Sequence, residues 1–243
     1  MKENIRIVLV EPSHPGNIGG AARALKNMGL TDLCVVNPKR FPDPQAEWRA
    51  AGAQDVLENI TVVDSVQTAV ADCHLVMGTS TRSRSIPWPV DTADASAVKL
   101  VSAAKVGSVA VLFGRENSGL SNEELQMCHQ HLVIPANPEY PSLNLAMAVQ
   151  IVAYEIQKIT ANIENVPKDN WDKPAASMAE VEGFYEHLDK VLTDIDFHDP
   201  KSPRQSTARL RRLFNRIRPD ETEIQMLRGI LHLIETHSNS GSK

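Results

Sequence analysis

The stretch from Ile134 to Glu155 restricts the possible folds more than any other part of the chain. It begins as the end of an apolar strand, passes through a loop holding Pro135, Pro138 and Pro141, and ends as a long helical pattern. Proline fixes φ and lacks an amide donor, so three prolines exclude regular structure and stiffen the loop. Such a loop between two buried elements predicts a ligand-binding segment, with an ordinary strand–loop–helix connection as the open alternative.

The length of 243 residues fits one large domain, or a medium domain followed by a small one. No stretch approaches the roughly 18 uncharged apolar residues of a membrane span, so we expect no membrane partner. Three cysteines lie far apart, and an odd count indicates no disulfide framework. The chain also enters a strand-like run at Ile5 without a signal sequence. These features predict a cytoplasmic protein.

The charge distribution predicts a local anionic partner. The net charge is −5, yet the segment from Lys201 to Arg218 holds seven basic residues and no acidic one. Taking those seven charges away leaves −12 for the rest of the chain. An acidic protein with one basic segment is typical of a partner bound at that segment, and nucleic acid is one such partner.

Residues 1–160 alternate short apolar runs with helical patterns, which predicts a parallel α/β sheet covered on both faces. The predicted strands are Ile5–Val10, Leu33–Val36, Ile60–Val63, Leu75–Met77, Val109–Phe113 and Leu132–Ile134. The predicted helices between them include Ile18–Met28, Val66–Ala71 and Ser121–Cys128. Ligands of such sheets lie beyond the carboxyl ends of the strands. We therefore expect the site at residues 11–20, 78–81, 114–119 and 135–144.

From Asn162 to Lys173 the helical pattern fails, and a linker is predicted. Three helices are predicted beyond it. The first is capped by Ser177 with Glu180, and the second runs from about Thr207 to Ile217. The third begins near Asp220. The second helix carries Arg209, Arg212 and Arg216 beside its apolar stripe.

The glycine-rich turn after the first strand, from His14 to Gly20, predicts an anion site because free amides at a helix start favour negative charge. It is not a dinucleotide fingerprint, because the spacing of its glycines differs and the second strand ends in Asn37 rather than an acid. No phosphate-binding loop of the G-x-x-x-x-G-K type occurs either. Arg23 lies two turns into the helix, where a plain surface arginine is the alternative.

Two further stretches place polar groups at strand ends. Phe113-Gly-Arg-Glu-Asn-Ser-Gly-Leu follows a buried strand, and Gly114 permits a close approach of a ligand. The stretch from Gly78 to Arg84 offers hydroxyls and the guanidinium groups of Arg82 and Arg84 for phosphate or ribose; a capped polar loop is its alternative. Cys128-His-Gln-His fits no standard zinc spacing, so we expect structural roles and no metal.

Three of these stretches resemble the motifs of the SPOUT superfamily of RNA methyltransferases. They are H-P-G-N-I-G-G-A-A-R-A from His14, F-G-R-E-N-S-G-L from Phe113 and I-P-A-N-P-E-Y-P-S-L-N-L-A from Ile134. Within that superfamily the chain is similar to enzymes that methylate the ribose 2′-hydroxyl of cytidine or uridine at nucleotide 32 of the tRNA anticodon loop. The resemblance continues into the helical tail, at Leu210-Arg-Arg-Leu-Phe-Asn-Arg-Ile-Arg-Pro and Leu227-Arg-Gly-Ile-Leu.

The resemblance implies a SPOUT α/β domain over residues 1–160, with a trefoil knot in which 135–144 threads under a neighbouring loop. The sequence pattern divides the rest of the chain into a linker at 161–175, a three-helix domain at 176–238 and a disordered tail at 239–243, and the resemblance implies that the helical domain binds tRNA. S-adenosylmethionine is the implied cofactor, held inside the knot. The implied assembly is a homodimer that packs the first helix and the knot helix across its interface.

The resemblance also implies roles for single residues. Those implied to bind the cofactor are Thr79, Ser80, Thr81, Gly114, Ile134, Pro141, Ser142 and Leu143. Arg23 is the implied catalytic residue, oriented together with the ribose by Asn17, Glu116, Ser142 and Asn144. The chain departs from the family pattern at Pro141, where serine is frequent, and at Gly20, where alanine or serine is common.

The chemistry narrows what Arg23 can do. A guanidinium does not lose its proton at neutral pH, so we expect Arg23 to hold a substrate phosphate rather than to act as a base. Arg209, Arg212 and Arg216, with Arg82 and Arg84, are expected to bind RNA phosphates. For the basic helix, ion pairs to Glu182, Glu186 and Asp189 of the preceding helix are the alternative. A SPOUT-like RNA-binding protein without catalysis, and a methyltransferase acting on ribosomal RNA, are the alternative functions.

Overall fold

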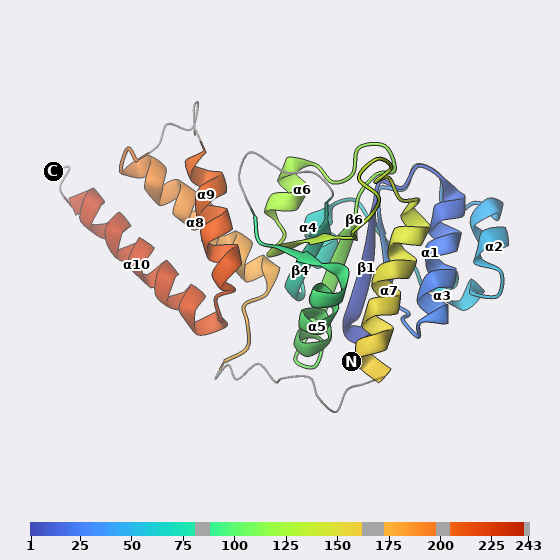
Figure 1. The fold of residues 1–243 in the computed structure, drawn as a ribbon. Helices are drawn as coiled ribbons and strands as arrows, with labels where there is room; N and C mark the ends of the chain where they lie inside the picture. Colours follow the sequence, from blue (N-terminus) through green and yellow to red (C-terminus); the bar gives the residue numbers. More distant parts are fainter. Residues whose placement is uncertain (81–87, 162–172, 198–204, 241–243) are drawn as a thin grey trace.

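A single parallel sheet organises the fold (Figure 1). The computed structural model describes residues 1–80, 88–161, 173–197 and 205–240. Within those residues seven strands pair in the order β3-β2-β1-β6-β4-β7-β5. They are β1 Ile5–Val10, β2 Leu33–Val36, β3 Thr61–Val63, β4 Cys73–Thr79, β5 Val90–Thr92, β6 Ser108–Phe113 and β7 Gln130–Val133. Every pairing among them is parallel, which confirms the predicted sheet.

Helices cover both faces of the sheet because successive strand residues point to opposite sides. Ile7 and Leu9 belong to one apolar core, whereas Val8 and Val10 belong to the other. The first face is covered by α1 Pro15–Asn27, α5 Ala93–Ala103 and α7 Leu145–Ala161, with α2 Pro44–Ala50 and α3 Gln54–Glu58 beside α1. The second face is covered by α4 Val66–Val70, α6 Asn122–Gln126 and the start of α8 Met178–Asp194.

The six strands predicted from sequence are present, and five further elements among the described residues were not predicted. These are β5, α2, α3, α5 and a short 3₁₀ helix at Lys2–Asn4. β5 has only three residues at the edge of the sheet, too few to give an alternating pattern. α1 begins at Pro15 rather than Ile18, because proline suits the first helical position and the His14 side chain accepts a hydrogen bond from the Gly16 amide.

The path around β7 is unusual for a parallel sheet. β7 lies between β4 and β5, both of which precede it in the sequence. After β7 the chain returns as α7, which packs between α1 and α5 (Figure 1). The trefoil knot implied by the resemblance needs such a return past earlier segments, and the knot itself stays a prediction.

The C-terminal helices have a core of their own. It is formed by α8, α9 Ser206–Ile217 and α10 Glu221–Ser240. Phe184, Tyr185 and Phe214 belong to this core, and the two phenylalanine rings pack edge to face with their centroids 4.8 Å apart. The predicted capping box of Ser177 and Glu180 starts α8. Among the described helices none combines the length and the apolar character that crossing a membrane requires.

Buried Asn215 joins the helical region to the sheet region. Its Nδ2 donates to the carbonyls of Gln126 at 3.0 Å and Cys128 at 3.3 Å, and its Oδ1 accepts from the Tyr185 hydroxyl at 2.7 Å. The carbonyl of Cys128 also accepts from the indole N–H of Trp88 at 2.9 Å. Asn215 therefore fixes α9 to the segment between α6 and β7.

Candidate active site

A pocket opens where β4, β6 and β7 end, as expected for ligand sites of parallel sheets. Its volume of about 360 Å³ falls within the usual range for small-molecule sites. Every residue implied to bind the cofactor lines it, except Thr81, which lies outside the described residues together with Arg82 and Arg84. The lining residues from that set are Thr79, Ser80, Gly114, Ile134, Pro141, Ser142 and Leu143.

The glycine at position 114 is required by the protein's own backbone. A Cβ placed on Gly114 would lie 2.1 Å from the carbonyl carbon of Gly119 and 2.2 Å from the amide nitrogen of Leu120. The loop from Arg115 to Gly119 folds back on itself through two backbone hydrogen bonds, at 2.9 and 3.2 Å. Gly114 was expected to allow a close approach of a ligand. The structure shows that the missing side chain leaves room for this turn, which forms one wall of the pocket.

The anion site predicted at the start of α1 is filled by a side chain of the protein. The Glu116 carboxylate accepts from the backbone amides of Ser13 at 3.1 Å and His14 at 3.2 Å. It also accepts from the Ser13 hydroxyl at 2.9 Å and from Asn17 Nδ2 at 2.8 Å. Burial raises the pKa of Glu116, but these hydrogen bonds outweigh it and lower the pKa to about 2. Glu116 is thus an ionised acceptor that orients its neighbours.

The depressed pKa of Glu116 predicts a pH-dependent loss of stability. Because the folded pKa lies near 2 against an ordinary 4.5, the ionised carboxylate stabilises the fold above pH 4.5, and this contribution disappears as pH falls towards 2. In thermal melts the Tm difference between wild type and Glu116→Gln should be largest at neutral pH and shrink across this window. Glu139→Gln, at an exposed loop position, is the matched control. An offset for Glu116→Gln that is constant with pH would contradict the assignment.

Asn17 links the loop after β6 to the proline-rich loop before α7. Its Oδ1 accepts from Asn144 Nδ2 at 2.9 Å, while its own Nδ2 donates to Glu116. Asn144 in turn starts α7, because its Oδ1 accepts from the Ala146 amide at 3.0 Å. The three stretches recognised in the sequence therefore meet through the side chains of Glu116, Asn17 and Asn144.

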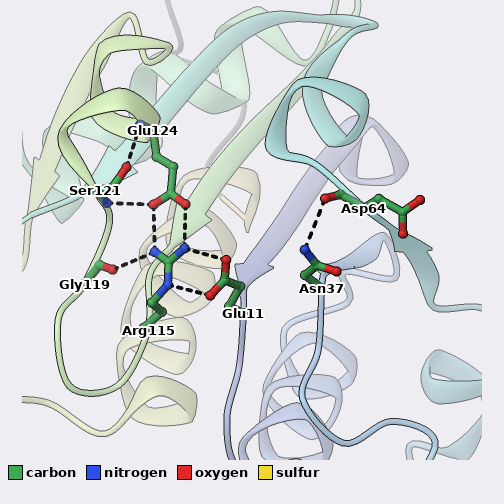
Figure 2. A network of polar contacts seen from close by, with 7 residues as sticks. All are labelled: Glu11, Asn37, Asp64, Arg115, Gly119, Ser121 and Glu124. Carbon is green, nitrogen blue, oxygen red and sulfur yellow. Dashed lines mark hydrogen bonds and ion pairs between the residues drawn. The ribbon is translucent and has the colours of Figure 1, made fainter.

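Arg115 joins the loop after β6 to the residue that follows β1 and to α6 (Figure 2). Its guanidinium forms an ion pair with Glu11 at 2.7 Å and a two-pronged pair with Glu124 at 2.9 and 3.0 Å. These partners raise the pKa of Arg115 above its ordinary value, so it stays charged. Sequence reasoning missed this residue's role, although the capping box of Ser121 and Glu124 already placed a carboxylate nearby. Adjacent residues Arg115 and Glu116 thus tie the β6 loop to the β1 loop twice.

Asn37, shown on the right of Figure 2, has a structural role, because its side chain binds the backbone of this chain. Its side-chain amide donates to the backbone carbonyl of Asp64 at 3.4 Å, and its φ is 47°. The residue that replaces the ribose-binding acid of a dinucleotide site therefore closes a turn after β2.

Arg23 does not line the pocket of its own chain. It is exposed on α1, and among the described residues its side chain has no hydrogen bond or ion pair. The glycines of α1 show which way it faces: α2 packs at Gly19, where an added Cβ would lie 2.0 Å from the Ala46 carbonyl oxygen, and α7 packs at Gly20, 2.8 Å from the Ala146 methyl. Arg23 stands on the outward ridge between these two helices. The departure at Gly20 is explained by the same close approach.

The basic helix divides into paired and exposed arginines. Arg211 forms a two-pronged pair with Glu182 at 2.7 and 2.8 Å and lies 4.4 Å from the centroid of the Tyr185 ring. Arg209 and Arg216 are exposed, whereas Arg212 is partly buried. The pairing with the preceding helix that stood as the alternative therefore applies to Arg211, a residue outside the predicted set.

The histidines near Cys128 have structural partners. His129 Nδ1 accepts from the Val76 amide at 3.0 Å, and burial lowers its pKa to about 3. The imidazole of His131 stacks on Trp88, with ring centroids 5.5 Å apart. Within the described residues no three His, Cys, Asp or Glu side chains group as potential metal ligands.

Comparison with known proteins identifies two families along the chain. The SpoU rRNA Methylase family matches residues 4–154, and the C-terminal domain of the tRNA methyltransferase TrmJ matches residues 179–243. The tRNA (cytidine/uridine-2′-O-)-methyltransferase TrmJ of Cronobacter sakazakii is 49% identical over 242 residues, covering 98% of this chain and 99% of that protein. The protein of the same name from Escherichia coli K12 is 50% identical over 245 residues, covering 100% and 99%.

Solved structures resemble the whole fold, including the helical region. TrmJ from Z. mobilis ZM4 superimposes with a TM-score of 0.82 at 36% identity, covering 95% of this chain and 98% of that one. A probable methylase family protein from Haemophilus influenzae Rd KW20 covers 100% of both chains, with a TM-score of 0.64 at 42% identity.

Proposed function

Because the chain belongs to the SpoU methylase family and to its TrmJ branch, we propose that it methylates the ribose 2′-hydroxyl of cytidine or uridine in tRNA. The observation that carries this proposal is the junction of Glu116, Asn17 and Asn144 beside the pocket, which joins all three family motifs. We further propose nucleotide 32 of the anticodon loop as the target and the cytoplasm as the location. The target nucleotide follows from the resemblance, and the location follows from the sequence features described above.

The residues of the pocket fit S-adenosylmethionine. The turn from Gly114 to Gly119 and the residues from Pro141 to Leu143 provide backbone polar groups, while Leu120, Leu132 and Leu145 provide apolar walls for an adenine ring. Thr79 presents its hydroxyl oxygen as an acceptor, because its proton is donated to the Leu112 carbonyl at 3.0 Å. Pro141 offers no N–H, so any cofactor contact at that residue is to its ring or carbonyl. The cofactor supplies a methyl group activated by a sulfonium.

The chain's part in catalysis is positioning. A ribose hydroxyl is a weak nucleophile, so oxygen, methyl carbon and sulfur must be held in line, and such alignment can supply much of the rate enhancement. Asn144 and Asn17 are fixed through Glu116, which keeps this edge of the pocket rigid. We propose that Arg23 binds the phosphate next to the target ribose and orients the hydroxyl. The proton then passes to phosphate or water.

We propose that the enzyme is a homodimer whose interface includes the outward faces of α1 and α7. Met147 is 63% exposed and Tyr154 50% exposed, and they lie two turns apart on α7. Large apolar side chains left exposed on one helix face are typical of an interface. In such a dimer Arg23, which is directed away from its own pocket, can complete the site of the partner.

We propose that the exposed arginines of α9 bind the tRNA backbone. Replacing Arg216 by alanine should raise the KM for tRNA and reduce the salt dependence of binding by about one unit of slope per lost phosphate contact. Lys105→Ala, at an exposed turn before β6, is the control. Binding isotherms at several salt concentrations measure the slope, and identical slopes for the two variants would refute the assignment.

The function is tested by two measurements on the full-length protein. Isothermal titration with S-adenosylmethionine should show binding, and tritiated methyl transfer to unmodified tRNA should give a nuclease-resistant 2′-O-methylated nucleotide. Mapping that nucleotide decides position 32. Transfer to ribosomal RNA but not to tRNA, or cofactor binding without transfer to either, would overturn the proposal.

A further inference from the structure

The surface of α2 next to the start of α1 carries an exposed aromatic ring among cations. Trp48 is 71% exposed, and the Arg49 guanidinium carbon lies 5.2 Å from the centroid of its ring. Lys39 and Arg40 are exposed in the loop that leads into α2. We define Lys39, Arg40, Trp48 and Arg49 as the α2 patch. An exposed tryptophan is costly in water, and its pairing with arginine leaves one ring face open.

The charges of the α2 patch are only partly compensated. Arg40 forms an ion pair with Asp43 at 2.8 Å. Lys39 and Arg49 form no side-chain hydrogen bond or ion pair with any part of the chain that the structure describes. Nearby carboxylates are already engaged, since Glu11 pairs with Arg115 and Glu116 accepts from the amides of Ser13 and His14; Glu47 remains on α2. The patch is therefore locally positive on an acidic protein.

The α2 patch is held rigidly next to the proposed reaction site. Backbone of α2 is pressed against α1 at Gly19, where no side chain would fit. Arg49 covers the first turn of α1, with its Cγ 3.4 Å from the point where a Cβ on Gly16 would stand. Gly16 and Arg23 are seven residues apart, so they share one side of the helix about 10 Å apart along its axis. The patch and Arg23 thus border the same outward ridge.

We propose that the α2 patch is a second RNA-contacting surface of this enzyme, on which an unpaired nucleotide of the tRNA stacks against Trp48 while Lys39 and Arg49 bind neighbouring phosphates. Single-stranded loops are recognised by this combination of an aromatic ring and cations, because every base has a stacking face. The inference rests on the proposed function, and it adds a site on the opposite side of Arg23 from α7.

The test compares Trp48→Ala and Trp48→Phe with Val106→Ala, which removes an equally exposed apolar side chain at the turn before β6. Loss of one base–aromatic stack should raise the KM for unmodified tRNA about 5- to 100-fold in Trp48→Ala. Trp48→Phe should retain most of the affinity, and Val106→Ala should match wild type. The affinity for S-adenosylmethionine, the kcat at saturating tRNA and the Tm should be unchanged, because Trp48 touches neither the pocket nor the core.

Failure of this inference is distinguishable from failure of the proposed function. If wild type methylates tRNA and Trp48→Ala has an unchanged KM, the α2 patch does not contact RNA. If Trp48→Ala instead shifts the protein to monomers in analytical ultracentrifugation, the patch is a contact between copies of the chain and the inference is overturned. If wild type transfers no methyl group to tRNA, the proposed function itself has failed.

Discussion

Arg23→Ala should retain its fold and its affinity for S-adenosylmethionine and lose methyl transfer. The side chain is exposed and has no partner among the described residues, so its removal costs little stability. A positioned cation that acts on the reacting group is worth about 100- to 1,000-fold in kcat. Single-turnover transfer to tRNA measures the loss. Lys26→Ala, one turn later on α1, removes a surface cation and should leave kcat near wild type.

Arg23→Lys tests whether Arg23 must bind the phosphate through two hydrogen bonds or whether a positive charge alone is sufficient. Lysine cannot bind phosphate with two prongs, so we expect this variant to recover only part of the lost rate. A full recovery would show that charge alone suffices, and a wild-type rate in Arg23→Ala would remove the residue from the mechanism.

Gly114→Ala should bind the cofactor more weakly, because the new methyl group cannot fit without moving the turn that forms one wall of the pocket. Its contacts would be with backbone atoms 2.1 and 2.2 Å away, which cannot swing aside as a side chain can. Overpacking of this kind costs about 1–3 kcal/mol, which corresponds to an about 5- to 140-fold weaker Kd if the cost falls on the pocket. Calorimetric titration with S-adenosylmethionine measures it.

Gly183→Ala is the matched control for this substitution. Gly183 lies inside α8, and the nearest atom to its added Cβ is Arg228 Nη1 at 3.9 Å. Alanine there should leave cofactor binding unchanged and raise stability by up to about 1 kcal/mol, since glycine is a poor helix former. An unaltered Kd in Gly114→Ala would mean that the turn from Arg115 to Gly119 is not a wall of the cofactor site.

Arg23→Ala and Gly114→Ala together test the proposed dimer. If Arg23 completes the partner's pocket, a heterodimer of Arg23→Ala and Gly114→Ala chains has one intact site. At a cofactor concentration near the wild-type Kd, random pairing of co-expressed chains should then restore about a quarter of wild-type activity, although each variant alone is much less active. No recovery in a verified heterodimer would show that Arg23 serves the pocket of its own chain.

The sequence predicts the longer strands and the helix caps of this protein, but not its short edge strand. The apolar runs of β1, β2 and β6 and the capping boxes at Ser121 and Ser177 are strong local signals, and the structure confirms them. β5 was missed because it has only three residues and forms a strand only through its pairing with β7, so the local sequence holds no signal for it. The predicted pocket residues do converge, because the carboxyl ends of parallel strands share one edge.

Relations across the chain were harder to predict. The anion site at α1 was predicted as a ligand site, yet its occupant is Glu116, about a hundred residues later in the sequence. Arg211 and Arg216 look alike in the sequence, and only the packing of α8 against α9 shows that Glu182 neutralises the former. The requirement for Gly20 likewise depends on α7, which lies far along the chain.

The carbonyl of Cys128 is shared by Trp88, which follows the segment holding Arg82 and Arg84, and by Asn215 of the basic helix. Replacing α8–α10 by the same helices of a relative therefore requires matching residues at the junction between α6 and β7. A chimera joined at the linker alone should keep both folds but lose this shared contact, which sets the orientation of the C-terminal helices relative to the sheet. If α8–α10 bind tRNA as proposed, an engineered exchange of tRNA preference should transfer residues 126–128 together with these helices.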